Sequence, residues 1–175
     1  MIIYDKSDIH HKAKQFLEQE CPYVKVKDID WDNASDPGDS YNCIGFAVGD
    51  MKWWAPPLVS GGVRLNPEHH WPESVQVCED DVDNVPLDLF IEAMKTARFE
   101  NCKDGEWEGD YDKITIYHDE ERFRHVAIHI SPSAWKSKLG LYSDFEHAPK
   151  SIDCQLYGSG RCFMRRTKQV KSSSP

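Results

Sequence analysis

The sequence contains no long uninterrupted apolar run. None of its apolar stretches reaches the roughly 20 residues that a membrane-spanning helix needs. Residues 1–6 also lack the charged and apolar regions of a signal peptide. The sequence therefore predicts no membrane contact, and a protein that stays in the cytoplasm or is exported without a cleavable signal peptide.

The sequence also lacks the paired cysteine spacing of zinc sites. Its six cysteines include no Cys-x-x-Cys pair, so we predict no metal site and no cofactor. A reducing cytoplasm would leave every thiol free, whereas an exported form could carry one disulfide bridge, for example between Cys154 and Cys162.

Basic residues are few for a protein of this size. Lys and Arg number 21 against 30 Asp and Glu, and the net charge of −9 disfavours nucleic acid as a partner. The content of 39% hydrophobic and 11% aromatic residues fits a globular protein. We expect one domain over residues 1–167 and a disordered tail over residues 168–175.

The segment 39–50 carries the most informative residue, Cys43, at the junction between a polar turn and an apolar helix. A thiol at the start of a helix lies beside unpaired N–H groups and the positive end of the helix dipole, which favour the thiolate. The same N–H groups can hold an oxyanion. Cys43 is therefore a candidate nucleophile; the alternative is a buried cysteine that packs as a small apolar residue.

A candidate base opens a predicted strand at residues 124–130. The alternation there places His125, Ala127 and His129 on one face of the strand. A cysteine at the head of a helix and a histidine that opens a strand roughly 80 residues later form the layout of papain-like hydrolases. The sequence thus predicts Cys43 and His125 as a catalytic pair, with His129 lining the cleft or the core.

A third group should orient the ring of His125. Ser137, in the following strand, is the first choice, and His147 is the second, although Ser137 could equally lie on a surface strand. Tyr41 and Asn42 are candidates for binding the oxyanion or substrate, and Tyr41 could instead pack at the start of the helix.

An aromatic stretch over residues 53–72 follows the nucleophile helix. Its tryptophans, Trp54 among them, could form the wall of a substrate cleft or fill the core. We leave both interpretations open.

The periodicity of the chain predicts an α+β fold, in which the nucleophile helix packs against an antiparallel sheet. Helices are expected at residues 10–20, 42–52 and 86–98, and a short helix or turn at 144–147. Strands are expected at residues 24–26, 113–117, 124–130 and 135–140, with a last strand within 157–165, whereas 50–72 and 99–111 should be irregular connections.

Two groups of motifs resemble known families. Asn-Cys-Ile-Gly-Phe at 42–46 and His-Val-Ala-Ile-His at 125–129 resemble the papain-like superfamily, in its NlpC-type branch of cell-wall peptidases. A longer series resembles a family of uncharacterised bacterial proteins with a Tyr-Asn-Cys-Ile-Ala-Trp-Ala-like motif. That series comprises residues 41–47, 53–54, 70–72, 113–117, 125–127, 135–140 and 146–147, with departures at Phe46 and His70.

The resemblance implies a papain-like fold and a cysteine-dependent amide hydrolase, either a peptidase or an amidase. It implies a peptide, an isopeptide or a peptidoglycan stem peptide as substrate. The setting would be an antibacterial effector with an inhibitor (immunity) protein, or a protease of a defence or modification system. The alternatives are a glutamine deamidase or acyl transferase with the same catalytic pair, and a non-catalytic binding module on a papain-like scaffold.

Overall fold

The structure, a computed structural model, is a mixed α+β domain. It describes residues 6–21, 41–60, 63–139, 144–148 and 150–168. The helices are α1 (Lys6–Glu20), α2 (Cys43–Val48) and α3 (Leu87–Thr96), with a 3-10 turn, η2, at Glu79–Asp81. The strands are β1 (Val59–Ser60), β2 (Val63–Arg64), β3 (Glu100–Cys102), β4 (Tyr111–Asp119), β5 (Arg122–Ser131), β6 (Ala134–Lys138), β7 (Asp144–His147) and β8 (Gly160–Thr167).

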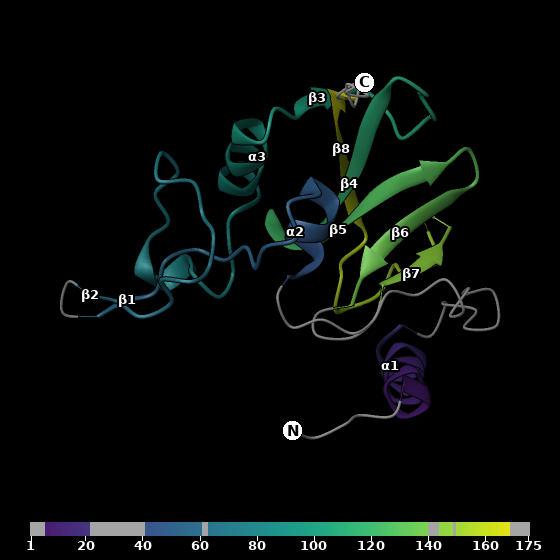
Figure 1. Cartoon of the computed structure of the whole chain (residues 1–175), viewed down its shortest axis with the longest axis horizontal. Coiled ribbons are helices and arrows are strands. Elements are labelled where there is room, and N and C mark those ends of the chain that lie inside the picture. The colour runs from purple at the N-terminus through teal and green to yellow at the C-terminus, as the bar shows by residue number, and fades with distance from the viewer. Residues whose placement is uncertain (1–5, 22–40, 61–62, 140–143, 149, 169–175) are drawn as a thin grey trace, which may run out of the picture.

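The main sheet has six strands in the order β3-β8-β4-β5-β6-β7, and all of its neighbouring strands are antiparallel. β4, β5, β6 and β7 follow one another along the chain, whereas β8 returns to pair with β4. Figure 1 shows α2 in front of β5 and α1 beyond β6 and β7. The small β1–β2 hairpin lies at the end of the molecule remote from β6 and β7.

The two faces of the sheet form two apolar clusters. Val126 points to a cluster that includes Trp71 and Phe90 and receives α2 and α3. The next residue, Ala127, points to a second cluster that includes Leu17 of α1 and Tyr157. Because successive side chains of a strand point to opposite faces, β5 separates two different environments.

Helix α2 is shorter than the predicted helix at 42–52. It ends at Gly49, which has a left-handed φ of 82° and whose N–H donates to the carbonyls of Gly45 and Phe46. The chain then folds back so closely that a Cβ on Gly45 would lie 1.9 Å from the carbonyl oxygen of Lys52. The missing side chain of Gly45 therefore permits the close backbone approach of the returning segment.

Several predicted elements need correction. Residues 144–147 form strand β7 rather than a helix or turn, because Trp135 and Lys136 of β6 pair with them. The polar connection 99–111 contains β3, and the irregular stretch 50–72 contains the β1–β2 hairpin. The strand predicted at 24–26 and the tail predicted at 168–175 lie outside the described residues, except for Lys168, which bonds to Asp110 and Gly109.

A disulfide bond joins Cys21 to Cys154. Of the two alternatives that the sequence left open, the structure has the one with a single bridge, but the suggested Cys154–Cys162 pairing is wrong. Among the described cysteines, the free thiols belong to Cys43, Cys78, Cys102 and Cys162. Within the described part of the chain, no helix is long and apolar enough to cross a membrane.

Candidate functional site

Asn42 fixes the start of helix α2, where Cys43 lies. Its side-chain oxygen accepts hydrogen bonds from the N–H groups of Gly45 at 3.2 Å and Trp54 at 3.3 Å. Its side-chain amide donates to the carbonyl of Trp54 at 2.6 Å. Asn42 therefore caps the helix and binds the following segment to it. Its predicted role toward a substrate stays a prediction beside this structural role.

Opposing influences set the pKa of the Cys43 thiol. Burial is the largest, and it raises the pKa to about 11. The backbone N–H groups of Val126, Ile44 and Cys43 act in the opposite direction, as does the positive charge of Lys138. Desolvation thus outweighs the N–H groups at the start of this six-residue helix and favours the neutral thiol in the resting protein.

His125 lies at the beginning of β5, only 3% exposed. Its ring centroid is 4.3 Å from that of Tyr157 and 6.0 Å from that of Tyr117. Burial, and then the proximity of His147, lower the pKa of His125 to about 3, so the ring is neutral at pH 7. Its Nε2 is buried and has no hydrogen-bond partner within the described structure.

Cys43 and His125 contact different apolar clusters. Cys43 packs against the cluster that contains Val126, whereas the ring of His125 contacts Tyr117 and Tyr157 of the other cluster. No hydrogen bond joins the thiol to the ring in the part of the chain that the structure describes. Two effects link their surroundings. The N–H of Val126, the neighbour of His125, lowers the pKa of the thiol, and burial, with a smaller contribution from a deprotonated Cys43, raises the pKa of Tyr157.

Ser137 and His147, the candidates for the third group, bind each other. The Ser137 hydroxyl and His147 Nε2 are 2.7 Å apart, and both residues are buried. His147 Nδ1 lies 2.9 Å from the carbonyl of Ala148, which can only accept, so we assign the ring proton to Nδ1. Nε2 then accepts the hydroxyl proton of Ser137. Burial lowers the pKa of His147 to about 4.

This assignment limits what Ser137 can do for His125. Because its only hydroxyl proton goes to His147, Ser137 could serve His125 only as an acceptor. His147 contributes to lowering the pKa of His125, so the Ser137–His147 pair lies close enough to act electrostatically on the candidate base. The predicted orienting role of either residue stays a prediction.

The remaining candidates lie in packed surroundings. Trp54 is buried, and its indole N–H donates to the carboxylate of Asp50 at 3.0 and 3.1 Å. His129 is buried and stacks on Trp135, with ring centroids 4.1 Å apart. Both positions match the core interpretation that the sequence left open. Tyr41 is buried under the ammonium group of Lys138, which lies 5.1 Å from its ring centroid.

Two residues next to the candidate site, Tyr157 and Lys138, were not predicted from the sequence. Tyr157 contacts His125 from a turn before β8, and no local motif marks it. Lys138 is fully buried beside the Cys43 site, although it stands in a segment that could equally have formed a surface strand. No sequence signal was available, because alternation places Lys138 on the same strand face as Lys136 and opposite to Trp135 and Leu139.

Metal binding receives no support from the residues around Cys43. Among the residues that the structure describes, no group of three or more His, Cys, Asp or Glu side chains is arranged to hold a metal ion.

The fold and site define a class: an α+β domain in which a short helix that begins with a cysteine packs on an antiparallel sheet that carries a buried histidine, His125. The chain belongs to a family described as a domain of unknown function, DUF7689, which matches residues 33–165. That match spans the candidate site from Tyr41 to Tyr157. No curated protein and no solved structure shows a significant match to the chain.

Proposed function

We propose that the protein is a cysteine-dependent amide hydrolase with a papain-like, NlpC-type arrangement, in which Cys43 is the nucleophile and His125 the base. The observation that carries the proposal is the position of Cys43, at the first residue of α2 and packed against the cluster that contains Val126, the neighbour of His125 in β5. The N–H groups of Ile44 and Cys43 come from the start of α2, and that of Val126 comes from the strand residue beside His125. Such a set of donors can stabilise the oxyanion of acyl transfer.

The proposed reaction starts from a neutral thiol and a neutral imidazole. Cys43 Sγ forms a bond to the substrate carbonyl carbon while its proton passes to His125, and the carbonyl electrons move onto the oxygen. Collapse of this intermediate breaks the C–N bond, and the proton passes from His125 to the leaving amine. Water then hydrolyses the thioester, with His125 again acting as base.

In the resting state the ring of His125 contacts Tyr157 and Tyr117, so the reaction also requires the ring to turn toward the thiol. Substrate binding at Cys43 would supply the energy for that movement. The Ser137–His147 pair would then fix the reoriented ring through its acceptor oxygen.

The substrate class follows from the resemblance to NlpC-type peptidases: a peptide, an isopeptide or a peptidoglycan stem peptide. Two settings fit this chemistry. One is an exported antibacterial amidase with an inhibitor (immunity) protein, and the other is a protease of a defence or modification system in the cytoplasm.

A second candidate is a non-catalytic binding module on the same scaffold. The resting site favours it in one respect: burial raises the pKa of Cys43 to about 11 and lowers that of His125 to about 3. Both shifts oppose a thiolate–imidazolium pair. In this alternative Cys43 is a packing residue of the α2 cluster.

The candidates are separated by product analysis. Wild-type protein, Cys43→Ala and the exposed-thiol control Cys78→Ala are incubated with peptidoglycan sacculi, a lysine isopeptide and a glutamine-containing peptide, and products are identified by mass spectrometry. The proposal predicts cleavage by wild type and Cys78→Ala, and none by Cys43→Ala. Ammonia release from the glutamine peptide without chain cleavage would identify a deamidase instead. Identical product profiles for wild type and Cys43→Ala would leave the binding module.

A further inference from the structure

The β1–β2 hairpin exposes an unusual number of large apolar side chains. Leu58, Val59, Val63 and Leu65 are 42%, 47%, 63% and 62% exposed. Seven large hydrophobic side chains are exposed in the described part of the chain, and four of them belong to this hairpin. Contiguous apolar surface of this kind in a small domain marks an interaction site more often than chance exposure does.

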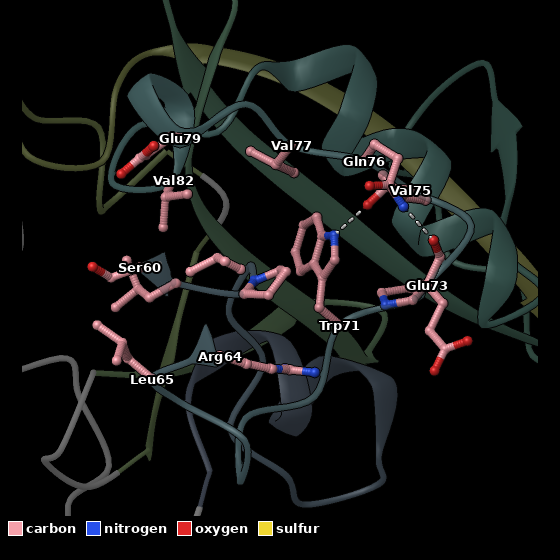
Figure 2. A pocket seen from close by; sticks show the side chains of 14 residues that line it. Ser60, Arg64, Leu65, Trp71, Glu73, Val75, Gln76, Val77, Glu79 and Val82 are labelled. Carbon is pink, nitrogen blue, oxygen red and sulfur yellow. Dashed lines mark hydrogen bonds between the residues drawn. The ribbon is translucent and has the colours of Figure 1, made fainter. Parts of the chain in front are cut away.

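A groove of about 580 Å³ runs behind the hairpin. Figure 2 shows Trp71 in its centre, with the hairpin residues Ser60 and Leu65 on one side and Gln76 on the other. Val75, Val77 and Val82 complete an apolar wall. A groove of this size accommodates several side chains of a bound segment.

The groove is held in shape by hydrogen bonds of its own. The indole N–H of Trp71 donates to the carbonyl of Val75 at 2.9 Å, which fixes the ring. The buried side chain of Asn66 accepts from the N–H of Leu58 at 2.9 Å and donates to the carbonyl of Pro56 at 3.0 Å. These bonds close the base of the hairpin and fix the Trp71 ring, so binding would require little ordering of either.

Acidic residues surround the groove. Glu73 and Glu79 are exposed and lie at opposite ends of it in Figure 2. Residues 53–94 contain eight Asp and Glu but one basic residue, Arg64. Arg64 donates to the carbonyl of His69 at 2.5 Å, so its guanidinium is anchored to the groove's own backbone. The groove thus combines an apolar wall with a negatively charged rim.

We propose that this groove binds a segment of a partner protein in which apolar and basic side chains alternate. The apolar side chains of the segment would cover Trp71 and Leu65, and its Lys or Arg side chains would face Glu73 and Glu79. None of the residues proposed for the cysteine chemistry lines the groove. The site therefore goes beyond the proposed hydrolase activity, and it stands or falls independently of that activity.

The test uses three short fluorescent peptides and measures their binding to the full chain by anisotropy. One alternates leucine and lysine, one leucine and glutamate, and one serine and lysine. We expect the leucine–lysine peptide to bind about ten-fold or more tightly than either of the others, and to weaken as salt is added. Comparable binding of the serine–lysine or the leucine–glutamate peptide would overturn the proposal, because charge or apolar surface alone would then suffice.

Matched surface variants locate the binding. Leu65→Ser should weaken the leucine–lysine peptide about ten-fold, and Glu79→Gln about two- to five-fold. The controls Met51→Ser and Glu18→Gln, also exposed but outside the groove, should change nothing. An equal loss in the control variants would overturn the proposal.

Sedimentation of the same proteins tests for a different occupant. A wild-type dimer that Leu65→Ser converts to a monomer would show that a second copy of the chain fills the groove, and would also overturn the proposal. The proposal predicts a monomer for both proteins.

Discussion

At the scale of single residues, Cys43 shows why position alone does not define a nucleophile. The start of a helix and the N–H groups of Ile44 and Val126 lower the pKa of its thiol, but desolvation acts more strongly in the opposite direction. A largely desolvated thiol whose pKa is raised to about 11 is protonated at neutral pH. In the hydrolase that we propose, its proton would leave during the attack on the carbonyl rather than before it.

This balance predicts the pH dependence of alkylation. Because the pKa of Cys43 is raised to about 11, its thiolate fraction at pH 7 is small and grows about ten-fold for each pH unit up to pH 10. Iodoacetamide labelling, followed by mass spectrometry of each cysteine peptide, should show this rise for Cys43. The exposed Cys78 is the internal reference for accessibility and should react faster at pH 7. Rapid labelling of Cys43 at pH 6 would contradict the account.

The positions of Cys43 and His125 could be predicted from sequence because each depends on local pattern. A polar turn before an apolar helix places the thiol, and alternation places the histidine on a strand. Their pKa values and the contact between His125 and Tyr157 could not be predicted. Those properties depend on burial by segments that are distant in the sequence, and a local sequence pattern does not predict such burial.

At the scale of elements, the turn after α2 positions the candidate nucleophile. The chain reverses at Gly49 and returns over Gly45, whose missing side chain leaves room for the carbonyl of Lys52. Asn42 and Trp54 then fasten the returning segment to the start of the helix. The helix, the turn and the following aromatic stretch thus form one unit around Cys43.

Gly45→Ala should disrupt this unit. A Cβ at that position would lie 1.9 Å from the backbone oxygen of Lys52, so the turn would have to move. We expect the free energy of unfolding in urea to fall by about 2 kcal/mol or more. The control Gly109→Ala should change it by less than about 0.5 kcal/mol, since the nearest atom to its Cβ would be 4.0 Å away. Equal stability of both variants would refute the role of Gly45.

The strands β4 and β5 were predictable from alternation and β-branched residues, within a few residues at their ends, and β8 only as a last strand of less certain bounds. β7 was not, because Asp144–His147 contains two acidic residues and a histidine and has no strong strand propensity. Its pairing with β6 overrides that weak local preference.

At the scale of the whole molecule, the disulfide between Cys21 and Cys154 joins the end of α1 to the turn before β8. The two cysteines are 133 positions apart in the sequence. Sequence could not specify this pairing, because six cysteines allow many pairings and only the folded chain selects one. The bond holds the end of α1 against the second apolar cluster, which contains Tyr157. Tyr157 in turn contacts the ring of His125.

Loss of this bond should destabilise the domain, because a long loop of the unfolded chain would no longer be closed. The double variant Cys21→Ser with Cys154→Ser should unfold in urea with a free energy lower by about 2–5 kcal/mol. A reductant should destabilise the wild type and the control Cys78→Ser, but leave the double variant unchanged. Insensitivity of the wild type to reductant would contradict the disulfide in the folded protein.

The central claim, that Cys43 forms an acyl-enzyme, is tested most directly by acid-quenched mass spectrometry of the cysteine peptides during reaction with sacculi, the isopeptide and the glutamine peptide. The account predicts that the acyl fragment of one of these substrates is attached to Cys43, as a thioester that hydroxylamine releases. The same fragment should be absent from Cys78 and from the Cys43→Ala variant. An acyl fragment on no thiol with any of the three substrates, or as often on Cys78 as on Cys43, would contradict the account.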